Sequence, residues 1–450
     1  MSTHLILLAA GEGTRMQSDT PKVLHEIAGL PMFAHALASA SELEDGEKIL
    51  VVGAGGDAVQ RAARDFDASI QVAEQTEQLG TAHAVTMAAP LLAGKGGTAI
   101  VLFGDTPFIQ SETLAKMAGA EADGADIVVL GFEAEDPARY GRLIVQDGRL
   151  ERIVEWKDAN EAERAITLCN SGVMLAKTET LLDLAAAVGN ENEAGEYYLT
   201  DIVALGRDKG LNSVVVTCDQ SETLGINTRA DLAAAEDVFQ ARARKAALEV
   251  GVTMPAPGTV IFSHDTLIGR DAIVEPNVVF APGVTVESGA RIRAFSHLEG
   301  CHVGRDAIVG PYARLRPGAE LSNDVRIGNF VEVKNAQIAD GAKVNHLSYI
   351  GDASIGEATN VGAGTITCNY DGVFKHRTEI GDRVFIGSNT MLVAPVTVGD
   401  EAMTATGTIV TKNVPAGDMA IGRPRQENKT GLARRLFAKL RAAKAARNKD

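Results

Sequence analysis

The chain has 450 residues, of which 45% are apolar and 4% aromatic, and it carries a formal net charge of −16. Its length predicts two or three domains, and the acidic balance argues against nucleic acid as a general partner. No apolar run is long enough to cross a membrane and no signal-peptide pattern precedes the first strand, so we expect a cytoplasmic protein without a membrane span. The four cysteines lack C-x-x-C spacing and are expected to be free thiols.

The first part of the chain, residues 1–228, alternates short apolar runs with helical stretches. Strands are expected at 5–8, 49–52, 99–103 and 127–131. This alternation predicts a Rossmann-like α/β domain with a parallel sheet, in which ligands bind where the strands end.

A glycine-rich turn that carries cations follows the first expected strand. Gly11 and Gly13 leave this turn almost without side chains, and Arg15 and Lys22 follow in the same stretch. Backbone N–H groups in such a bare turn can approach a phosphate chain closely. The turn therefore predicts a nucleoside triphosphate site. An ordinary strand-to-helix turn with two unrelated cations is the alternative.

An aspartate closes the expected strand 99–103. Asp105 follows this run at the edge where the carboxyl ends of parallel strands gather. A carboxylate beside a triphosphate is well placed to hold Mg²⁺, which takes oxygen ligands together with phosphate. We therefore expect Asp105 to be a Mg²⁺ ligand.

A long helix and then a new pattern follow. Residues 229–250 are rich in Ala, Leu, Glu and Arg, with Gly251 as a stop signal, and predict a linker helix between two domains. From 251 to 425, apolar residues such as Val274, Phe280 and Val286 recur every six positions. A helix needs a period of about 3.6 and a strand about two, so this pattern predicts a parallel β-helix with an apolar core. It resembles left-handed hexapeptide-repeat acyltransferases, which usually form trimers; a purely structural solenoid is the alternative.

The hexads are interrupted between positions 362 and 379. A solenoid core cannot absorb such an insertion, so we expect an outward loop, and long loops on rigid scaffolds often carry function. His346 follows the inward Val344 by two positions and is expected outside the core. There a neutral imidazole could take a proton from an amine that attacks a thioester, and Asn369 could polarise the acetyl carbonyl.

The end of the chain, 426–450, is basic and helical in pattern. Binding to a membrane surface is one interpretation. We favour the other, a solvated or partly disordered tail that packs against an acidic body.

The chain resembles known enzymes over residues 3 to about 425, with specific motifs in both halves. The string from 8 to 22, L-A-A-G-x-G-T-R-M-x-S-x-x-P-K, resembles the signature of sugar-nucleotide pyrophosphorylases. The whole resembles the bifunctional enzymes of UDP-N-acetylglucosamine synthesis, a uridylyltransferase fused to a glucosamine-1-phosphate N-acetyltransferase. The resemblance implies that glucosamine 1-phosphate is acetylated with acetyl-CoA. Transfer of UMP from UTP to the resulting N-acetylglucosamine 1-phosphate then releases pyrophosphate. The product is UDP-N-acetylglucosamine, a precursor of peptidoglycan and lipopolysaccharide. It also implies Mg²⁺ and a homotrimer formed through the β-helix.

The resemblance also assigns roles to residues of the first half. UTP and N-acetylglucosamine 1-phosphate would be bound by Leu8, Ala9, Ala10, Gly11, Gly13, Gln75, Gly80, Thr81, Gly141, Glu155, Asn170 and Asn227. The Gln75 amide, which offers a donor and an acceptor, would read the uracil edge. Arg15 and Lys22 would be catalytic by stabilising charge. Asn227 would join Asp105 as a metal ligand, and its alternative role is the N-cap of the following helix.

In the second half the resemblance makes His346 the catalytic base, supported by Glu332. Glucosamine 1-phosphate would be bound by Arg316, Lys334, Tyr349, Asn360 and Asn369. The acetyl-CoA site, shared between neighbouring subunits, would be lined by Ala363, Asn369, Tyr370, Ser388, Thr406 and Arg423.

Three positions depart from the family pattern, and two other functions compete. Glu12 stands where Lys is common, Trp156 where His is usual, and Thr406 where Ala is usual.

One competing function is a pyrophosphorylase whose β-helix is only regulatory. The other is a zinc site, because His297 and His302, five positions apart, resemble the ligands of hexapeptide-repeat carbonic anhydrases; no third His stands at a convincing repeat position.

Overall fold

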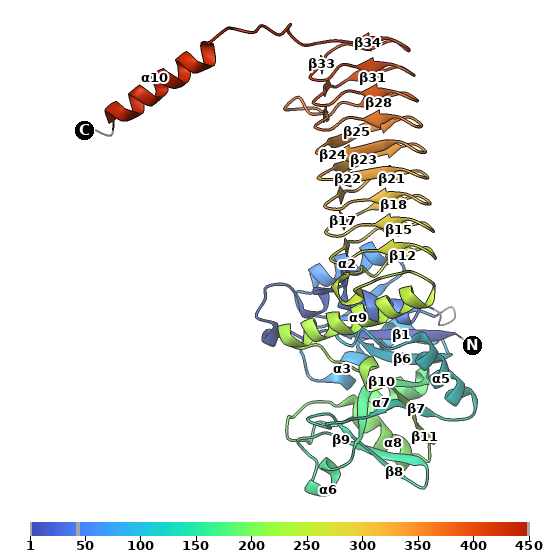
Figure 1. Ribbon diagram of the computed structural model, residues 1–450. Helices are drawn as coiled ribbons and strands as arrows, with labels where there is room; N and C mark the ends of the chain where they lie inside the picture. Colours follow the sequence, from blue (N-terminus) through green and yellow to red (C-terminus); the bar gives the residue numbers. More distant parts are fainter. Residues whose placement is uncertain (1, 42–45, 448–450) are drawn as a thin grey trace. The chain divides into compact units, whose positions relative to one another are not determined.

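The computed structural model describes residues 2–41 and 46–447. The chain divides into two compact units (Figure 1). The first extends to Ala246 and includes Phe262–Asp265, and the second holds Ala247–Ile261 and the chain from Thr266 onward. The helix expected as a linker therefore belongs mostly to the first unit. Within the described ranges, no helix has both the length and the apolar character needed to span a membrane.

A mixed sheet forms the centre of the first unit. Its main strands lie in the order β11-β7-β10-β6-β1-β4-β5. They are β1 (Thr3–Ala9), β4 (Lys48–Gly53), β5 (Gln71–Gln75), β6 (Thr98–Phe103), β7 (Ile127–Glu133), β10 (Leu168–Lys177) and β11 (Ser213–Cys218). The four expected strands are confirmed within β1, β4, β6 and β7. The expectation of a wholly parallel sheet is wrong, because β10 runs antiparallel between β6 and β7. This reversal brings the start of β10 to the edge where β7 ends.

Helices cover both faces of this sheet. One face carries α1 (Met32–Ser39), α2 (Asp57–Phe66) and α5 (Ser111–Ala122), and the other carries α3 (Thr81–Thr86), α7 (Thr178–Ala187) and α8 (Ile202–Asp208). Side chains of β1 alternate between the two cores, with Leu5 and Leu7 in one and Ile6 and Leu8 in the other. A strand buried on both faces is continuously apolar for this reason. The other elements are β2 (Glu26–Ile27), β3 (Leu30–Pro31), α4 (Ala89–Leu92), β8 (Arg142–Gln146), β9 (Arg149–Val154) and α6 (Glu161–Arg164).

The long helix α9 (Arg229–Glu249) begins with a reciprocal cap. The backbone N–H of Asp231 donates to the Thr228 hydroxyl (3.1 Å), and the backbone N–H of Thr228 donates to the Asp231 carboxylate (2.8 Å). Thr228 is therefore the N-cap, which leaves the Asn227 side chain for other contacts. Ala235 of α9 packs in an apolar cluster of the first unit, with Ile27, Met32, Phe108 and Ile226.

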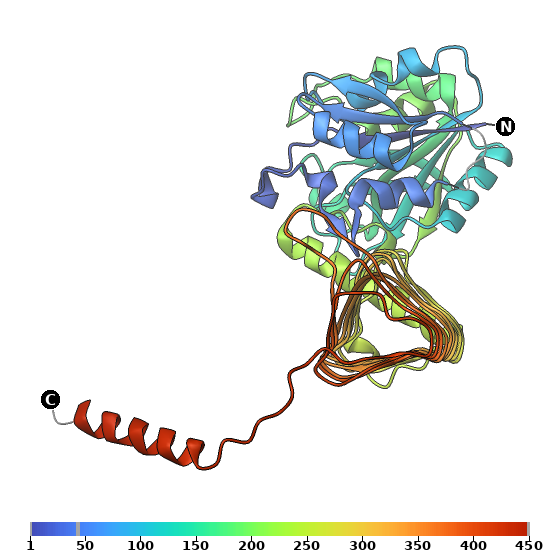
Figure 2. The same ribbon diagram turned by 90° about the horizontal axis from the view of Figure 1, so that it is seen from above.

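The second unit contains a parallel β-helix, and Figure 2 shows its three-sided cross-section. One ladder contains β12 (Leu267–Ile268), β15 (Val284–Val286), β18 (Cys301–Val303), β21 (Ala319–Leu321), β28 (Thr378–Ile380) and β31 (Val396–Val398). A second contains β14 (Val279–Phe280), β17 (His297–Leu298), β20 (Arg314–Leu315), β27 (Ile366–Cys368), β30 (Met391–Val393) and β33 (Ile409–Val410). Two longer strands, β23 (Glu332–Ile338) and β25 (Tyr349–Ile355), belong to both. The third contains β13 (Ile273–Val274), β16 (Arg291–Ile292), β19 (Ile308–Val309), β22 (Arg326–Asn329), β24 (Lys343–His346), β26 (Asn360–Val361), β29 (Phe385–Ile386), β32 (Met403–Thr404) and β34 (Met419–Ala420).

The expected inward residues fill the core of this β-helix. Val274, Val309 and Val344 are fully buried, whereas Ile268, in one of the first coils, is only partly buried. A second inward position, two residues earlier in each hexad, holds small side chains such as Ala272 and Ala307. The narrow space between three ladders explains why so few aromatic residues occur here.

The insertion in the hexads is shorter than expected. Across it Ala353 pairs with Thr378, 25 positions later, whereas ordinary coils repeat after 17 or 18 positions. The chain leaves the coil only between Asn369 and His376, where the His376 N–H donates to the Asn369 carbonyl (2.8 Å). The outward loop is confirmed, but its expected limits of 362 and 379 are wrong, because Ile366 still pairs with Tyr349 in the preceding coil.

The basic tail contains α10 (Leu432–Arg447), which confirms the predicted helix. None of its described residues is buried, and its sequence holds arginines and lysines but no carboxylate. Packing of this tail on an acidic surface stays a prediction.

Candidate active sites

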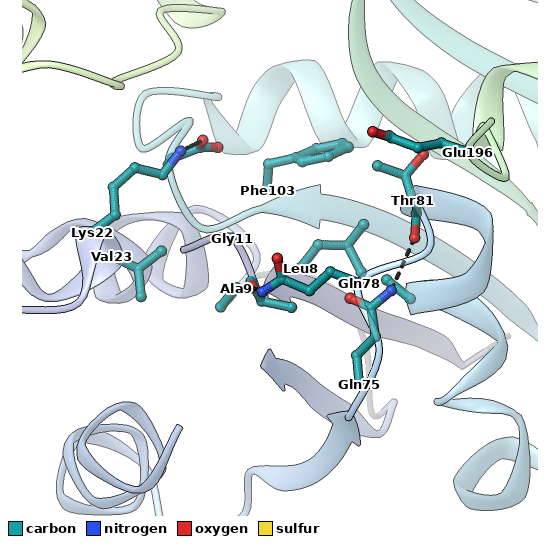
Figure 3. Close-up of a pocket in the computed structure, with 14 residues that line it drawn as sticks. Leu8, Ala9, Gly11, Lys22, Val23, Gln75, Gln78, Thr81, Phe103 and Glu196 are labelled. Atoms are coloured by element: carbon teal, nitrogen blue, oxygen red, sulfur yellow. Dashed lines mark hydrogen bonds and ion pairs between the residues drawn. The ribbon is translucent and has the colours of Figure 1, made fainter. Parts of the chain in front are cut away.

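A cavity of about 270 Å³ opens at the carboxyl ends of β1 and β6 (Figure 3). Its lining includes residues that the sequence predicted, namely Leu8, Ala9, Ala10, Gly11, Lys22, Gln75, Gly80, Thr81 and Asp105. The sequence analysis missed Phe103 and Glu196, which also line it. The amide of Gln78 donates to the Ala10 carbonyl and so ties the glycine-rich turn to the opposite wall.

Glycine is required at Gly80, which lines the cavity, and at Gly13, which packs against the lining residue Lys22. Gly13 has φ +64°, and a Cβ added there would lie 2.5 Å from the Lys22 Cβ. Gly80 has φ +124°, and a Cβ added there would lie 2.5 Å from the Tyr197 carbonyl oxygen. Side chains at these positions would displace Lys22 and the start of α3, so the glycines bring the backbone close enough to shape the cavity.

Four polar side chains converge beside this cavity. The ammonium group of Lys22 pairs with the Asp105 carboxylate and donates to the amide oxygen Oδ1 of Asn227 (3.1 Å). Nη2 of Arg15 donates to the same oxygen (2.8 Å). The backbone N–H of Ile226 donates to the Asp105 carbonyl (3.0 Å), which holds Asn227 beside Asp105. The structure thus brings together residues that the sequence analysis had selected one at a time.

The oxygen atoms of this cluster suit a hard cation. Asp105 and Asn227 both direct a side-chain oxygen at the Lys22 ammonium group, so a positive charge already lies between these two oxygen atoms. Mg²⁺ prefers this kind of donor and completes its shell with phosphate and water. No group of three or more His, Cys, Asp or Glu side chains that could hold a metal occurs in the described part of the chain. A metal here would therefore need ligands from a bound nucleotide.

Gln75 is nearly buried, at 3% exposure, in the wall of the cavity. Its amide nitrogen donates to the Gly80 carbonyl (3.0 Å) and to Nδ1 of His83 (3.1 Å). Both amide hydrogens are therefore engaged, and Oε1 is the atom that remains for a ligand. That Gln75 offers a base both a donor and an acceptor stays a prediction.

A second group of expected residues meets where the β8–β9 hairpin joins the start of β10. A Cβ added at Gly141 would lie 3.4 Å from Oε1 of Glu155 and 3.5 Å from the Asn170 Cβ. The Asn170 N–H donates to the Gly141 carbonyl (2.8 Å). Burial raises the pKa of Glu155, a hydrogen bond from Thr200 (3.4 Å) lowers it, and the nearby Asp201 raises it further. The three expected residues thus lie together as one polar group.

In the β-helix, His346 is exposed at the end of β24, as expected. Its Nδ1 lies 2.8 Å from Oδ1 of Asn329, which occupies the same position one coil earlier. An amide oxygen only accepts, so Nδ1 carries the proton and Nε2 is left unprotonated in the neutral ring. Sequence analysis missed Asn329, although its spacing of one coil from His346 was a usable signal. The Glu332 carboxylate pairs with Arg316 (2.8 Å) and Arg314 (3.9 Å), and its expected support of His346 stays a prediction.

A cluster of cations lies on the same coils. The ammonium group of Lys375, in the loop 369–376, lies close to that of Lys334, and its positive charge lowers the pKa of Lys334; burial and Arg316 lower this pKa further. Two adjacent ammonium groups repel each other until an anion binds them both, so the pair suits a phosphate group. Lys375 was not among the expected residues. Tyr349 lies opposite Glu332 in the backbone register of neighbouring coils. Asn360 lies opposite Lys343 in the ladder that carries His346.

Asn369 anchors the base of the loop 369–376. It is 7% exposed, and its amide nitrogen donates to the Asp352 carboxylate, which also accepts from Asn335 (2.6 Å). The structure thus gives Asn369 an anchoring role. Donation to an acetyl carbonyl stays a prediction.

The residues expected for acetyl-CoA follow one corner of successive coils. The Ala363 carbonyl accepts from the N–H of Asn389 (2.7 Å), and the Ser388 carbonyl accepts from the N–H of Gly407 (2.8 Å). Arg423 donates to the Thr406 carbonyl. These contacts place Ala363, Ser388 and Thr406 in a row. Tyr370 lies in the loop 369–376, exposed at 61%.

The two histidines of the competing zinc site lie on different ladders, His297 in β17 and His302 in β18. The ring of His302 lies between Glu287 (3.1 Å) and Glu320 (3.8 Å). This geometry gives the zinc interpretation no support.

Comparison with known proteins identifies both units. The family described as "MobA-like NTP transferase domain" matches residues 5–192, and "Hexapeptide repeat of succinyl-transferase" matches residues 377–412. Fold and sites thus define a nucleotidyltransferase domain joined to a hexapeptide-repeat β-helix.

The full chain has highly similar relatives. It is 63% identical to "Bifunctional protein GlmU" of Cereibacter sphaeroides over 449 residues, covering 100% of this chain and 99% of that protein. It is 63% identical to the protein of the same name from Ruegeria sp., covering 100% of both. The chain belongs to the GlmU family. As a member, it is a bifunctional enzyme, a UDP-N-acetylglucosamine pyrophosphorylase and a glucosamine-1-phosphate N-acetyltransferase.

Proposed function

We propose that each reaction uses one of the two sites, with acetylation first and uridylyl transfer second. The observation that carries this proposal is the separation of two chemistries between two units. The polar cluster around Lys22 lies in the first unit, and the imidazole with an unprotonated Nε2 lies in the second. An N-acetyl group made in the β-helix then becomes part of the sugar 1-phosphate that the α/β unit uses.

In acetyl transfer, His346 acts as the general base. Nε2 takes a proton from the amine of glucosamine 1-phosphate as the nitrogen attacks the thioester carbonyl of acetyl-CoA. The carbon–sulfur bond then breaks, the amide forms, and CoA leaves as a thiol after it receives the proton. Arg316, Lys334 and Lys375 hold the phosphate of the amino sugar, because three cations share that region.

Asn329 is expected to keep the imidazole in the productive tautomer. Asn329→Ala should lower kcat of acetyl transfer by roughly 10–100-fold with little change in KM, because the ring loses its orienting partner. Asn329→Asp, which keeps an acceptor at the same place, should retain most of the activity. Thiol release from acetyl-CoA measures both variants, and an unchanged kcat in Asn329→Ala would contradict the role.

In uridylyl transfer, a phosphate oxygen of N-acetylglucosamine 1-phosphate attacks the α-phosphorus of UTP, and pyrophosphate leaves. Backbone N–H groups of the turn 10–13 bind the phosphate chain, and Arg15 and Lys22 stabilise the charge that develops. Asp105 and Asn227 would hold Mg²⁺, which when bound neutralises phosphate charge.

Glu155 is expected to make sugar binding sensitive to pH. Its raised pKa means that it becomes protonated at a higher pH than an ordinary glutamate. If its carboxylate accepts hydrogen bonds from the sugar, the KM for N-acetylglucosamine 1-phosphate should rise as pH falls from about 8 to about 5. The substrate phosphate titrates in the same range, so Glu155→Gln is the control. A pH profile identical in both proteins would contradict the role.

We also propose a cytoplasmic homotrimer formed through the β-helix. Phe295, Tyr312 and Phe330 stack along one corner, with ring centroids 5.0 and 5.3 Å apart, and are about half exposed. Val373 and Phe374, at the tip of the loop 369–376, are 74% and 67% exposed. Apolar surfaces of this kind favour burial against another copy. Light scattering on the purified protein measures the mass, and a monomer would contradict this assembly.

The proposed pair of reactions is tested with two substrates and two products. Thiol release should occur with glucosamine 1-phosphate and not with glucose 1-phosphate, which lacks the amine. Pyrophosphate release should require UTP together with N-acetylglucosamine 1-phosphate. Absence of either product from wild-type protein would refute the corresponding half.

A further inference from the structure

The largest fully buried side chain of the described residues is a cation next to Gly141 in the chain. Arg142, at the start of β8, is 1% exposed. Its guanidinium donates to the carbonyls of Pro137 (3.2 Å), Ala138 (3.1 Å), Tyr140 and Arg164 (3.2 and 3.4 Å). All of these acceptors are backbone oxygens. The planar fork of an arginine is therefore used here as a rigid bracket between the loop 137–140 and the end of α6.

Trp156 strengthens the same connection. The guanidinium of Arg164, from the end of α6, lies over the indole ring at 4.5 Å from its centroid, and that of Arg139 lies at 5.5 Å. Nε of Arg164 also donates to the Trp156 carbonyl (3.3 Å). Cation–π contacts of this kind stabilise by about 0.5–1 kcal/mol each at exposed sites. We call Arg142, Arg139, Arg164 and Trp156 the arginine–tryptophan bracket.

The bracket is joined directly to two of the residues expected to bind the sugar. Gly141 lies between Tyr140 and Arg142 in the chain, and Glu155 directly precedes Trp156. These two residues are close to each other, since a Cβ at Gly141 would lie 3.4 Å from the Glu155 carboxylate. Movement of either segment would therefore change the distance between Gly141 and Glu155.

We propose that Arg142 and Trp156 are positioning residues for N-acetylglucosamine 1-phosphate in uridylyl transfer. They act through Gly141 and Glu155, whose separation they set. This inference rests on the proposed role of Gly141 and Glu155 in sugar binding. Trp156, in place of the histidine usual in the family, gives the bracket a larger aromatic face for Arg139 and Arg164.

The test compares the KM for sugar with the KM for UTP, because both substrates are used by the unit that carries the variants. Trp156→Ala should raise the KM for N-acetylglucosamine 1-phosphate about tenfold and leave the KM for UTP within about twofold. The reason is that only the segments carrying Gly141 and Glu155 shift. Trp156→Phe, which keeps an aromatic face, should restore most of the affinity. Acetyl transfer by the same proteins should be unchanged. Arg149→Ala, at the exposed other end of the β8–β9 hairpin, is the matched control and should change nothing.

Arg142→Lys gives a second, independent measurement. Lysine keeps the charge but cannot reach four carbonyls, so the sugar KM should rise at least as much as in Trp156→Ala. Circular dichroism establishes whether the first unit of this variant is folded, and if it is not, Trp156→Ala still decides. The inference is overturned if the KM values for sugar and UTP rise equally, or if neither changes. Absence of pyrophosphate release from wild-type protein would instead refute the uridylyl-transfer role itself.

Discussion

Replacement of His346 with alanine is expected to lower kcat of acetyl transfer by about 10²–10⁴-fold, the range that general bases contribute. Uridylyl transfer by the same protein should remain close to the wild-type rate. The reason is that His346 supplies the unprotonated nitrogen of the β-helix site, whereas the polar cluster around Lys22 belongs to the other compact unit. Thiol release and pyrophosphate release, measured on one preparation, check the two halves of this expectation.

His297→Ala is the matched control for this variant, since it also removes an exposed imidazole from the β-helix. It should leave both activities unchanged. Addition of imidazole to His346→Ala should restore part of the acetyl transfer if the missing group is a base. Retention of more than a tenth of the wild-type rate by His346→Ala would show that another group takes the proton.

The opposite result is expected at the nucleotide site. Asp105→Asn keeps the shape of the side chain but removes the charge that pairs with Lys22 and would hold a metal. Uridylyl transfer should fall by about 10²-fold or more, because charge on the phosphates is no longer balanced in the transition state. Acetyl transfer should persist. The Mg²⁺ concentration needed for half-maximal pyrophosphate release should also increase.

Asp123→Ala removes an exposed carboxylate just after α5 and is the control for the loss of one negative charge. It should not alter either activity. The two-site interpretation fails if Asp105→Asn or His346→Ala silences both reactions in folded protein. Circular dichroism and the mass of the assembly establish whether each variant is folded.

Several elements of this protein follow from local sequence because their causes are local. A continuous apolar run such as Leu5–Leu8 predicts a strand buried on both faces, and β1 is that strand. A period of six predicts the β-helix, because only a coil with three short faces returns an apolar side chain inward at that spacing. The bare turn beside the cavity could likewise be predicted, because absent side chains are visible in the sequence itself, and phosphate binding there stays a prediction.

Long-range pairing decided the rest. The direction of β10 could not be read from its composition, since an antiparallel strand buried between parallel ones is equally apolar. The Gln75 amide nitrogen donates hydrogen bonds to Gly80 and His83, which are not identified by the pattern around Gln75. The limits of the insertion depend on which residues still pair with the preceding coil. Each of these features depends on hydrogen bonds between particular residues, and a sequence pattern does not show which residues form those bonds.

By itself, then, the sequence determined the two kinds of repeat, the bare turn and the list of candidate polar residues, because each depends on spacing along the chain. Only the tertiary structure decided which of those residues meet. It joined Lys22 to Asp105 and Asn227, placed the amide of Asn329 beside His346, and surrounded the Arg142 guanidinium with backbone carbonyls. The physical reason is that a contact between distant segments depends on how the whole chain turns back on itself, which no local pattern contains.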